Sequence, residues 1–160
     1  MGNILKLIGY ILLCESAGVI GAIFTARSVR TWYVTLQKPP FNPPGWVFGP
    51  VWIVLYVMMG IALYLVWQKG PGWDGYTRAP VLFFTQFLLN AAWSFIFFGA
   101  KAVLPAFIEI TLLWILIVWT IVAFREISPA AAWLMVPYLL WVTFAAILNC
   151  SIWRLNNGAL

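Results

Sequence analysis

Charged residues are scarce in this sequence, at 8% of 160 residues, whereas soluble domains carry about 25%. Hydrophobic residues make up 64% of the chain. The few charges cannot cover the surface of a soluble protein of this size, so the solvent that fits this composition is a lipid bilayer. The sequence therefore predicts an integral membrane protein.

Histidine is absent, and the only two cysteines, Cys14 and Cys150, lie inside apolar runs. Without histidine or a CxxC spacing a zinc site has no ligand set, and two isolated cysteines give no disulfide framework. The lack of histidine also removes the usual axial ligand of haem iron. We expect no metal site and no obligatory cofactor.

The basic residues form no cluster. Nine Lys and Arg against four Asp and Glu give a net charge of +5, but the bases are scattered singly. A nucleic-acid partner is therefore not expected, because it would need a basic patch. The bases are better interpreted as anchors at the membrane surface. They divide almost evenly between the two sides, so they do not fix the orientation.

Five apolar stretches are long enough to cross a bilayer, which takes about 20 residues. They predict an all-α membrane protein whose residues 1–160 form a single five-helix transmembrane domain. The predicted spans are residues 4–24, 46–67, 79–99, 102–124 and 128–153. Only the first connection, residues 25–45, is long. It holds four prolines in the run Lys38-Pro-Pro-Phe-Asn-Pro-Pro-Gly45, which excludes a regular helix. We call it the proline loop and expect it to cap one end of the bundle as a lid.

Ten of the eleven tryptophans fall into two groups by depth. Six lie at span ends or in connections, as in an aromatic belt: Trp32, Trp46, Trp67, Trp73, Trp133 and Trp153. Four others lie deeper: Trp52, Trp93, Trp114 and Trp141. Counting from the proline loop, Trp52 and Trp93 are about 9 and 10 Å deep, and Trp141 is nearer the middle. At least three of these side chains can therefore share one half of the bundle.

Helical spacing joins the deep tryptophans to polar residues. The stripes are Gln86, Asn90, Trp93 and Phe97 in the third span, Trp52, Tyr56 and Met59 in the second, and Tyr138, Trp141, Ala145 and Asn149 in the fifth. Amides that face lipid would lack partners, so these stripes must face inward. They then either form hydrogen bonds between helices or line an aromatic cavity for a flat apolar ligand.

Two acids and a stripe of small residues also lie within the spans. Glu109 falls at the depth of Trp52 and is a candidate polar site, whereas Glu15 is interpreted as structural. On the first span Cys14, Gly18, Ala22 and Ala26 recur every four residues, with Ala17 and Gly21 beside them. This face permits close packing, either inside the bundle or against a second copy of the chain.

The order of these motifs resembles the tryptophan-rich sensory protein and translocator protein (TspO/MBR) family, formerly the peripheral benzodiazepine receptors. The resemblance rests on Trp32-Tyr33, Leu36-Gln-Lys-Pro39, Pro43-Pro44, the run from Trp46 to Trp52, Gln86 with Asn90 and Trp93, and Pro137-Tyr138 with Trp141 and Asn149.

The resemblance implies a pocket under the first loop for porphyrins and other flat apolar ligands, in a bacterial or mitochondrial outer membrane. Homodimers are common in that family. The family's pocket positions fall on Trp52, Tyr56, Asn90, Trp93, Trp141 and Ala145, and its lid positions on Tyr33, Pro43, Pro44 and Trp46. Many members also have an acid at the position of Glu109.

The resemblance leaves three kinds of function open: binding and sensing of a porphyrin, transport of a porphyrin or sterol, and degradation of protoporphyrin. A sterol is disfavoured, because the tyrosine expected between Leu148 and Arg154 is missing. Catalysis is also disfavoured, because the sequence offers no nucleophile with a base. We therefore expect a binding protein rather than an enzyme.

Overall fold

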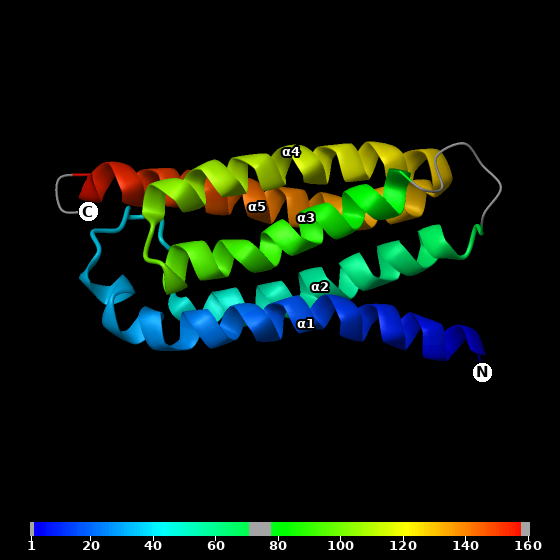
Figure 1. The fold of residues 1–160 in the computed structure, drawn as a ribbon, viewed down its shortest axis with the longest axis horizontal. Helices are drawn as coiled ribbons and strands as arrows, with labels where there is room; N and C mark the ends of the chain where they lie inside the picture. Colours follow the sequence, from blue (N-terminus) through cyan, green and yellow to red (C-terminus); the bar gives the residue numbers. More distant parts are fainter. Residues whose placement is uncertain (1, 71–77, 158–160) are drawn as a thin grey trace.

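The computed structural model, which describes residues 2–70 and 78–157, contains five long helices that run along one axis (Figure 1). They are α1 (Gly2–Thr31), α2 (Gly45–Trp67), α3 (Arg78–Ser94), α4 (Val103–Ile127) and α5 (Pro129–Asn156), with a short 3₁₀ turn, η1 (Tyr33–Thr35), after α1 and a π-helical turn, η2 (Phe95–Gly99), after α3. All five are long and apolar enough to cross a membrane, if η2 is counted with α3. The predicted five-span bundle is confirmed, and the protein is an integral membrane protein.

The helices form a closed ring. Each packs most extensively against two neighbours, in the cyclic order α1, α2, α5, α4, α3. The start of α1 and the end of α5 lie at opposite ends of the bundle (Figure 1). Large apolar side chains cover the outside of every helix, and Leu12, Val54, Leu88, Ile108 and Leu140 are each more than half exposed. This surface faces the lipid, and the ring encloses the site.

Several helices extend beyond the predicted spans. The first reaches Thr31 instead of residue 24, so the proline loop begins at Trp32. The fourth continues through Arg125 and Glu126, which were predicted to connect two helices. The hydropathy pattern marks the hydrocarbon limits, whereas a helix continues into the interface because its backbone bonds form there as well. Trp73 was predicted to lie in a connection and is outside the described residues.

Local interactions explain where α5 begins and how α3 ends. Ser128 caps α5, because its hydroxyl accepts a bond from the Ala131 N–H at 3.3 Å, and Pro129 follows at the first helical position. In η2 the Ala100 N–H bonds to the Phe95 carbonyl five residues back, at 2.8 Å. The Phe98 carbonyl accepts a 2.7 Å bond from Ser28 of α1. The π turn is thereby fixed against α1.

The small residues of the first helix pack inside the bundle. Cys14, Ala17, Gly21 and Ser28 are the buried residues of α1. A Cβ atom on Gly18 would lie 2.8 Å from the Tyr56 ring, and one on Gly21 would lie 2.9 Å from the Ser94 hydroxyl. Ala22 and Ala26 are exposed. The inward face of α1 is therefore used within one copy of the chain, which brings α1 close to the rings described next.

Candidate functional site

Aromatic rings from three helices pack against one apolar core in the half of the bundle near the proline loop. Trp52 stacks on Tyr56 at 5.3 Å between centroids and meets Tyr138 of α5 edge-on at 6.2 Å. On α3, Trp93 stacks on Phe97 at 4.9 Å. Such geometries are those that aromatic pairs prefer. The predicted stripes of α2, α3 and α5 therefore do face inward.

Trp141 contacts two other aromatic rings in this half of the bundle. Phe48 of α2 meets it edge-on at 5.8 Å, and Phe144 lies at 5.5 Å. Ala145, on the same helix, is half-buried and packs against the main apolar core. Phe48 was not among the predicted site residues, although its position four residues before Trp52 puts it on the same helical face.

Hydrogen bonds between side chains tie these helices together. The Tyr56 hydroxyl donates to Asn90 Oδ1 at 2.6 Å, and the Tyr138 hydroxyl donates to Gln86 Oε1 at 3.0 Å. Both acceptors lie on α3, so this helix is joined to α2 and to α5. Such bonds replace the water contacts that the hydrocarbon cannot supply.

Asn149 of α5 continues this network. Its Oδ1 accepts a 3.3 Å bond from the Trp93 indole, and its Nδ2 donates to the Val103 carbonyl of α4 at 2.9 Å. The interhelical hydrogen bonds expected for these amides are therefore present. Four of the five helices, α2 to α5, share this polar network.

Several buried polar atoms in the described part of the chain have no hydrogen-bond partner. In this half of the bundle they are Gln86 Nε2, Trp141 Nε1 and both carboxyl oxygens of Glu109. Glu109 is buried on α4. An unpaired buried polar group costs about 1–3 kcal/mol. These atoms could therefore gain bonds from a polar group that entered the bundle.

Trp114 lies outside this cluster. It is 37% exposed, and its indole donates a 2.8 Å bond to the Thr143 hydroxyl on the outer side of α4 and α5. The depth count placed it in the membrane correctly but could not give the direction in which it points. Three of the four deep tryptophans, Trp52, Trp93 and Trp141, thus share the interior.

The proline loop rests on the end of α3. Tyr33 packs against Phe97 and Phe98 at 6.2 and 5.8 Å, and its hydroxyl donates to Asn42 Oδ1 at 2.8 Å. Lys38 Nζ lies 4.8 Å from the centre of the Tyr33 ring. Burial raises the pKa of Tyr33 to about 12, so the phenol keeps its proton at neutral pH and can donate this bond.

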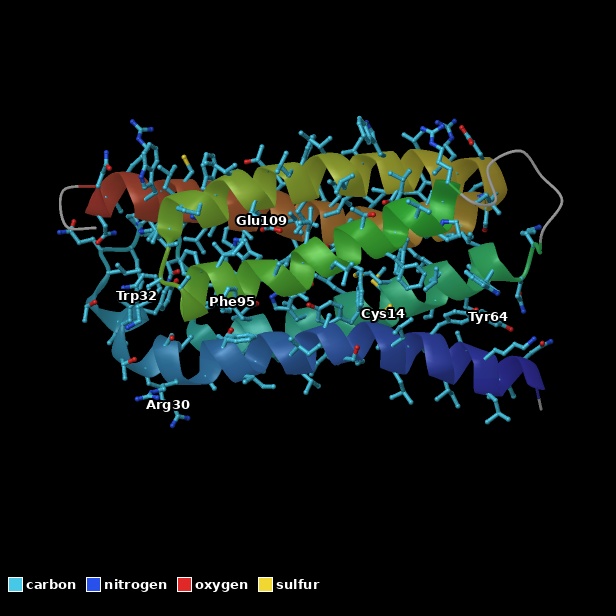
Figure 2. The ribbon with its side chains drawn as sticks, viewed as in Figure 1. Cys14, Arg30, Trp32, Tyr64, Phe95 and Glu109 are labelled. Carbon is cyan, nitrogen blue, oxygen red and sulfur yellow. The ribbon has the colours of Figure 1, made fainter. Side chains whose placement is uncertain are left out.

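The other predicted lid residues are less enclosed. Pro43 is half-buried, and Pro44 is an exposed residue at the start of α2. Trp46 is 76% exposed on the first turn of α2, which suits a tryptophan of the aromatic belt. Two loop residues outside the predicted set contribute more to packing: Trp32 meets Phe97 edge-on at 5.6 Å (its position is labelled in Figure 2), and Leu36 is buried.

Asn156, at the end of α5, ties the proline loop down. Its Oδ1 accepts a 3.0 Å bond from the Gln37 N–H, and its Nδ2 donates to the Gln37 carbonyl at 2.9 Å. Asn156 is buried although it lies in the last turn of the chain's last helix. The loop is thus held at both Tyr33 and Gln37, and the second attachment was not predicted.

Replacing Asn156 by alanine should free the middle of the proline loop. Two bonds to one backbone are lost together, each worth about 0.5–1.5 kcal/mol. We expect the Gln37 amide to exchange with deuterium about tenfold faster, which mass spectrometry of exchanged peptides would measure. Asn157→Ala changes the exposed neighbouring residue and serves as the control. Equal exchange in both variants would show that the two bonds do not hold the loop.

Comparison with known proteins agrees with this arrangement. Residues 10–154 match the sequence profile of the TspO/MBR family. The chain is 45% identical over 154 residues to the tryptophan-rich protein TspO of Archaeoglobus fulgidus, with 96% of this chain and 99% of that protein covered. It is 38% identical over 152 residues to the translocator protein of Ovis aries, covering 94% and 90%. It is 33% identical over 147 residues to the tryptophan-rich sensory protein of Cereibacter sphaeroides, covering 92% and 89%.

The profile covers all five helices at least in part, and these relatives match almost from end to end. The motifs that carried the resemblance, from Trp32 to Asn149, lie within the matched residues. The chain therefore belongs to the TspO/MBR family of tryptophan-rich sensory and translocator proteins.

Proposed function

We propose that this protein binds a metal-free porphyrin, or a similarly flat apolar ring, among the aromatic side chains of α2, α3 and α5. The observation that carries the proposal is that Trp52, Trp93 and Trp141, from three helices, pack against one apolar core in the half of the bundle under the proline loop. Aromatic faces hold flat apolar ligands well, and a few polar groups then set their orientation.

The unpaired polar atoms suggest how such a ring would be oriented. Gln86 Nε2 and Trp141 Nε1 are donors without acceptors, and Glu109 carries two oxygens without partners. A ligand with polar groups in its plane or at its edge would relieve part of this cost. The absence of histidine favours a ring without iron, because haem usually needs an axial ligand.

The propionate groups at the edge of a porphyrin need a cationic partner close to the membrane surface. Three bases lie near the proline loop: Arg27, Arg30 and Lys38. Arg30 points away from the bundle (Figure 2), and Arg27 is exposed on α1. Lys38 is half-buried in the proline loop and lies above Tyr33, which itself contacts Phe97. Lys38 is therefore the best-placed partner for a propionate group at the mouth of the bundle.

Entry of the ligand requires movement, because the rings are in contact with one another. Trp52 and Trp93 would have to leave their present stacking partners, Tyr56 and Phe97, and stack on the ligand instead. The proline loop would have to release its packing on α3, which its attachments at Tyr33 and Gln37 oppose. Binding is thus expected to be coupled to opening of the loop, which is a means by which a sensory protein can report its ligand.

Titration of the protein in nanodiscs with protoporphyrin tests the proposal. Protoporphyrin should quench tryptophan fluorescence until about one equivalent is bound, whereas haem should bind more weakly. Empty nanodiscs with free tryptophan provide the control for partition into lipid. Quenching that rises linearly with porphyrin and never saturates would contradict a defined site.

A further inference from the structure

The outer surface of the bundle carries a groove of about 480 Å³ between α4 and α5, away from the aromatic cluster. Its walls are mainly apolar and include Phe107, Trp114, Thr143, Ala146, Cys150 and Arg154. The volume lies within the range of small-molecule sites, about 300–1,000 Å³. The groove opens on the side that faces lipid, so its natural occupants come from the membrane.

The groove has the length of one leaflet. Thr143 and Arg154 are eleven positions apart on α5, which corresponds to about 16 Å at 1.5 Å per residue. Half of the bilayer hydrocarbon is about 15 Å thick. Arg154 is in the last turn of α5, at the membrane surface, and the Trp114–Thr143 bond closes the other end near the bilayer centre.

Polar groups along the groove leave one place for a charged headgroup. The hydroxyls of Thr111, Thr143 and Ser151 each donate to a carbonyl of their own helix, at 2.8 Å. They therefore present no free donor to a ligand. The Arg154 side chain is exposed and forms no ion pair or hydrogen bond within residues 2–70 and 78–157. Its guanidinium can hold a phosphate through two parallel bonds.

We propose that this groove is a binding site for an anionic phospholipid of the leaflet on the side of the proline loop. The phosphate lies on Arg154, and one acyl chain follows the groove past Ala146 to Trp114. Charge complementarity with Arg154 selects an anionic lipid over a zwitterionic one and over an uncharged sterol, and the length of the groove fits an acyl chain of one leaflet. This site is independent of the porphyrin proposal, because it lies on the opposite side of the ring wall formed by α4 and α5.

Native mass spectrometry of the protein taken from equimolar phosphatidylglycerol and phosphatidylcholine with identical chains tests this site. The wild type should retain phosphatidylglycerol in excess. Arg154→Gln should lower the ratio of retained phosphatidylglycerol to phosphatidylcholine about tenfold, as expected for one charge-assisted contact. Ala146→Phe, which fills the groove, should lower the retention of both lipids.

Arg30→Gln is the matched control, because Arg30 is exposed at the same end of the bundle but points away from it (Figure 2). Its lipid ratio should equal that of the wild type. An equal fall in Arg30→Gln and Arg154→Gln would overturn the proposal, since general surface charge would explain it. The proposal also fails if a sterol at equal concentration displaces the phospholipid, or if Ala146→Phe reduces a dimer peak and leaves lipid retention unchanged.

Discussion

Replacing Trp52 by alanine is expected to weaken protoporphyrin binding by about ten- to a hundredfold. Stacking of a flat ring on one aromatic side chain contributes about 1–3 kcal/mol in comparable sites, and Trp52 stacks on Tyr56 of its own helix and meets Tyr138 of α5. The affinity would be measured by the saturating fluorescence titration described above. Trp52→Phe keeps an aromatic face and should recover part of the affinity.

Trp133→Ala is the control for this substitution. Trp133 lies on α5 like Trp141 but is 72% exposed to lipid, so its loss should leave the affinity unchanged. Trp93→Ala and Trp141→Ala should weaken binding as Trp52→Ala does. If all three interior variants bind protoporphyrin as tightly as the wild type, the porphyrin does not lie among these rings.

Replacing Gly60 by alanine is expected to destabilise the whole bundle. A Cβ atom there would lie 2.6 Å from the Cα of Ile11 and 2.9 Å from its backbone nitrogen. Backbone atoms cannot rotate away as a side chain can, so α1 and α2 would have to separate. Overpacking of this kind costs about 1–3 kcal/mol, which corresponds to a fall of roughly 3–10 °C in the melting temperature.

Gly49→Ala gives the matched measurement on the same helix. Nothing lies within 4 Å of a Cβ atom added at Gly49. Its melting temperature in detergent should equal that of the wild type or slightly exceed it, because alanine favours a helix. If the Gly60→Ala and Gly49→Ala variants have the same melting temperature, then the close approach of α1 and α2 contributes little to stability.

The sequence predicted the membrane spans and the inward face of three helices for physical reasons. Hydropathy reports the hydrocarbon thickness, which sets the number of spans. Gln86, Asn90 and Asn149 then fixed the rotation of α3 and α5, because an amide must avoid lipid. Depth along the helix axis then predicted that Trp52, Trp93 and Trp141 share one half of the bundle.

The sequence analysis left the rotation of α4 open. Its residues are so uniformly apolar that only the depth of Trp114 could be predicted. Glu109 offered the missing signal: five residues along a helix turn the direction by about 140°, so an inward Glu109 points Trp114 outward. The contact between Gln37 and Asn156 was beyond pattern analysis, because 119 residues separate them and neither has a special spacing.

The order of the helices around the ring has a consequence for insertion of the chain into the membrane during synthesis. Of the five helices, α5 comes after the other four in the chain, and it fits between α2 and α4 and completes the ring. Until it arrives, Gln86 lacks Tyr138, and the nascent four-helix chain exposes an amide to acyl chains at a cost in free energy. The ring is thus completed only after the other four helices have been made, and until then the chain presents the insertion machinery with an open, polar-sided intermediate.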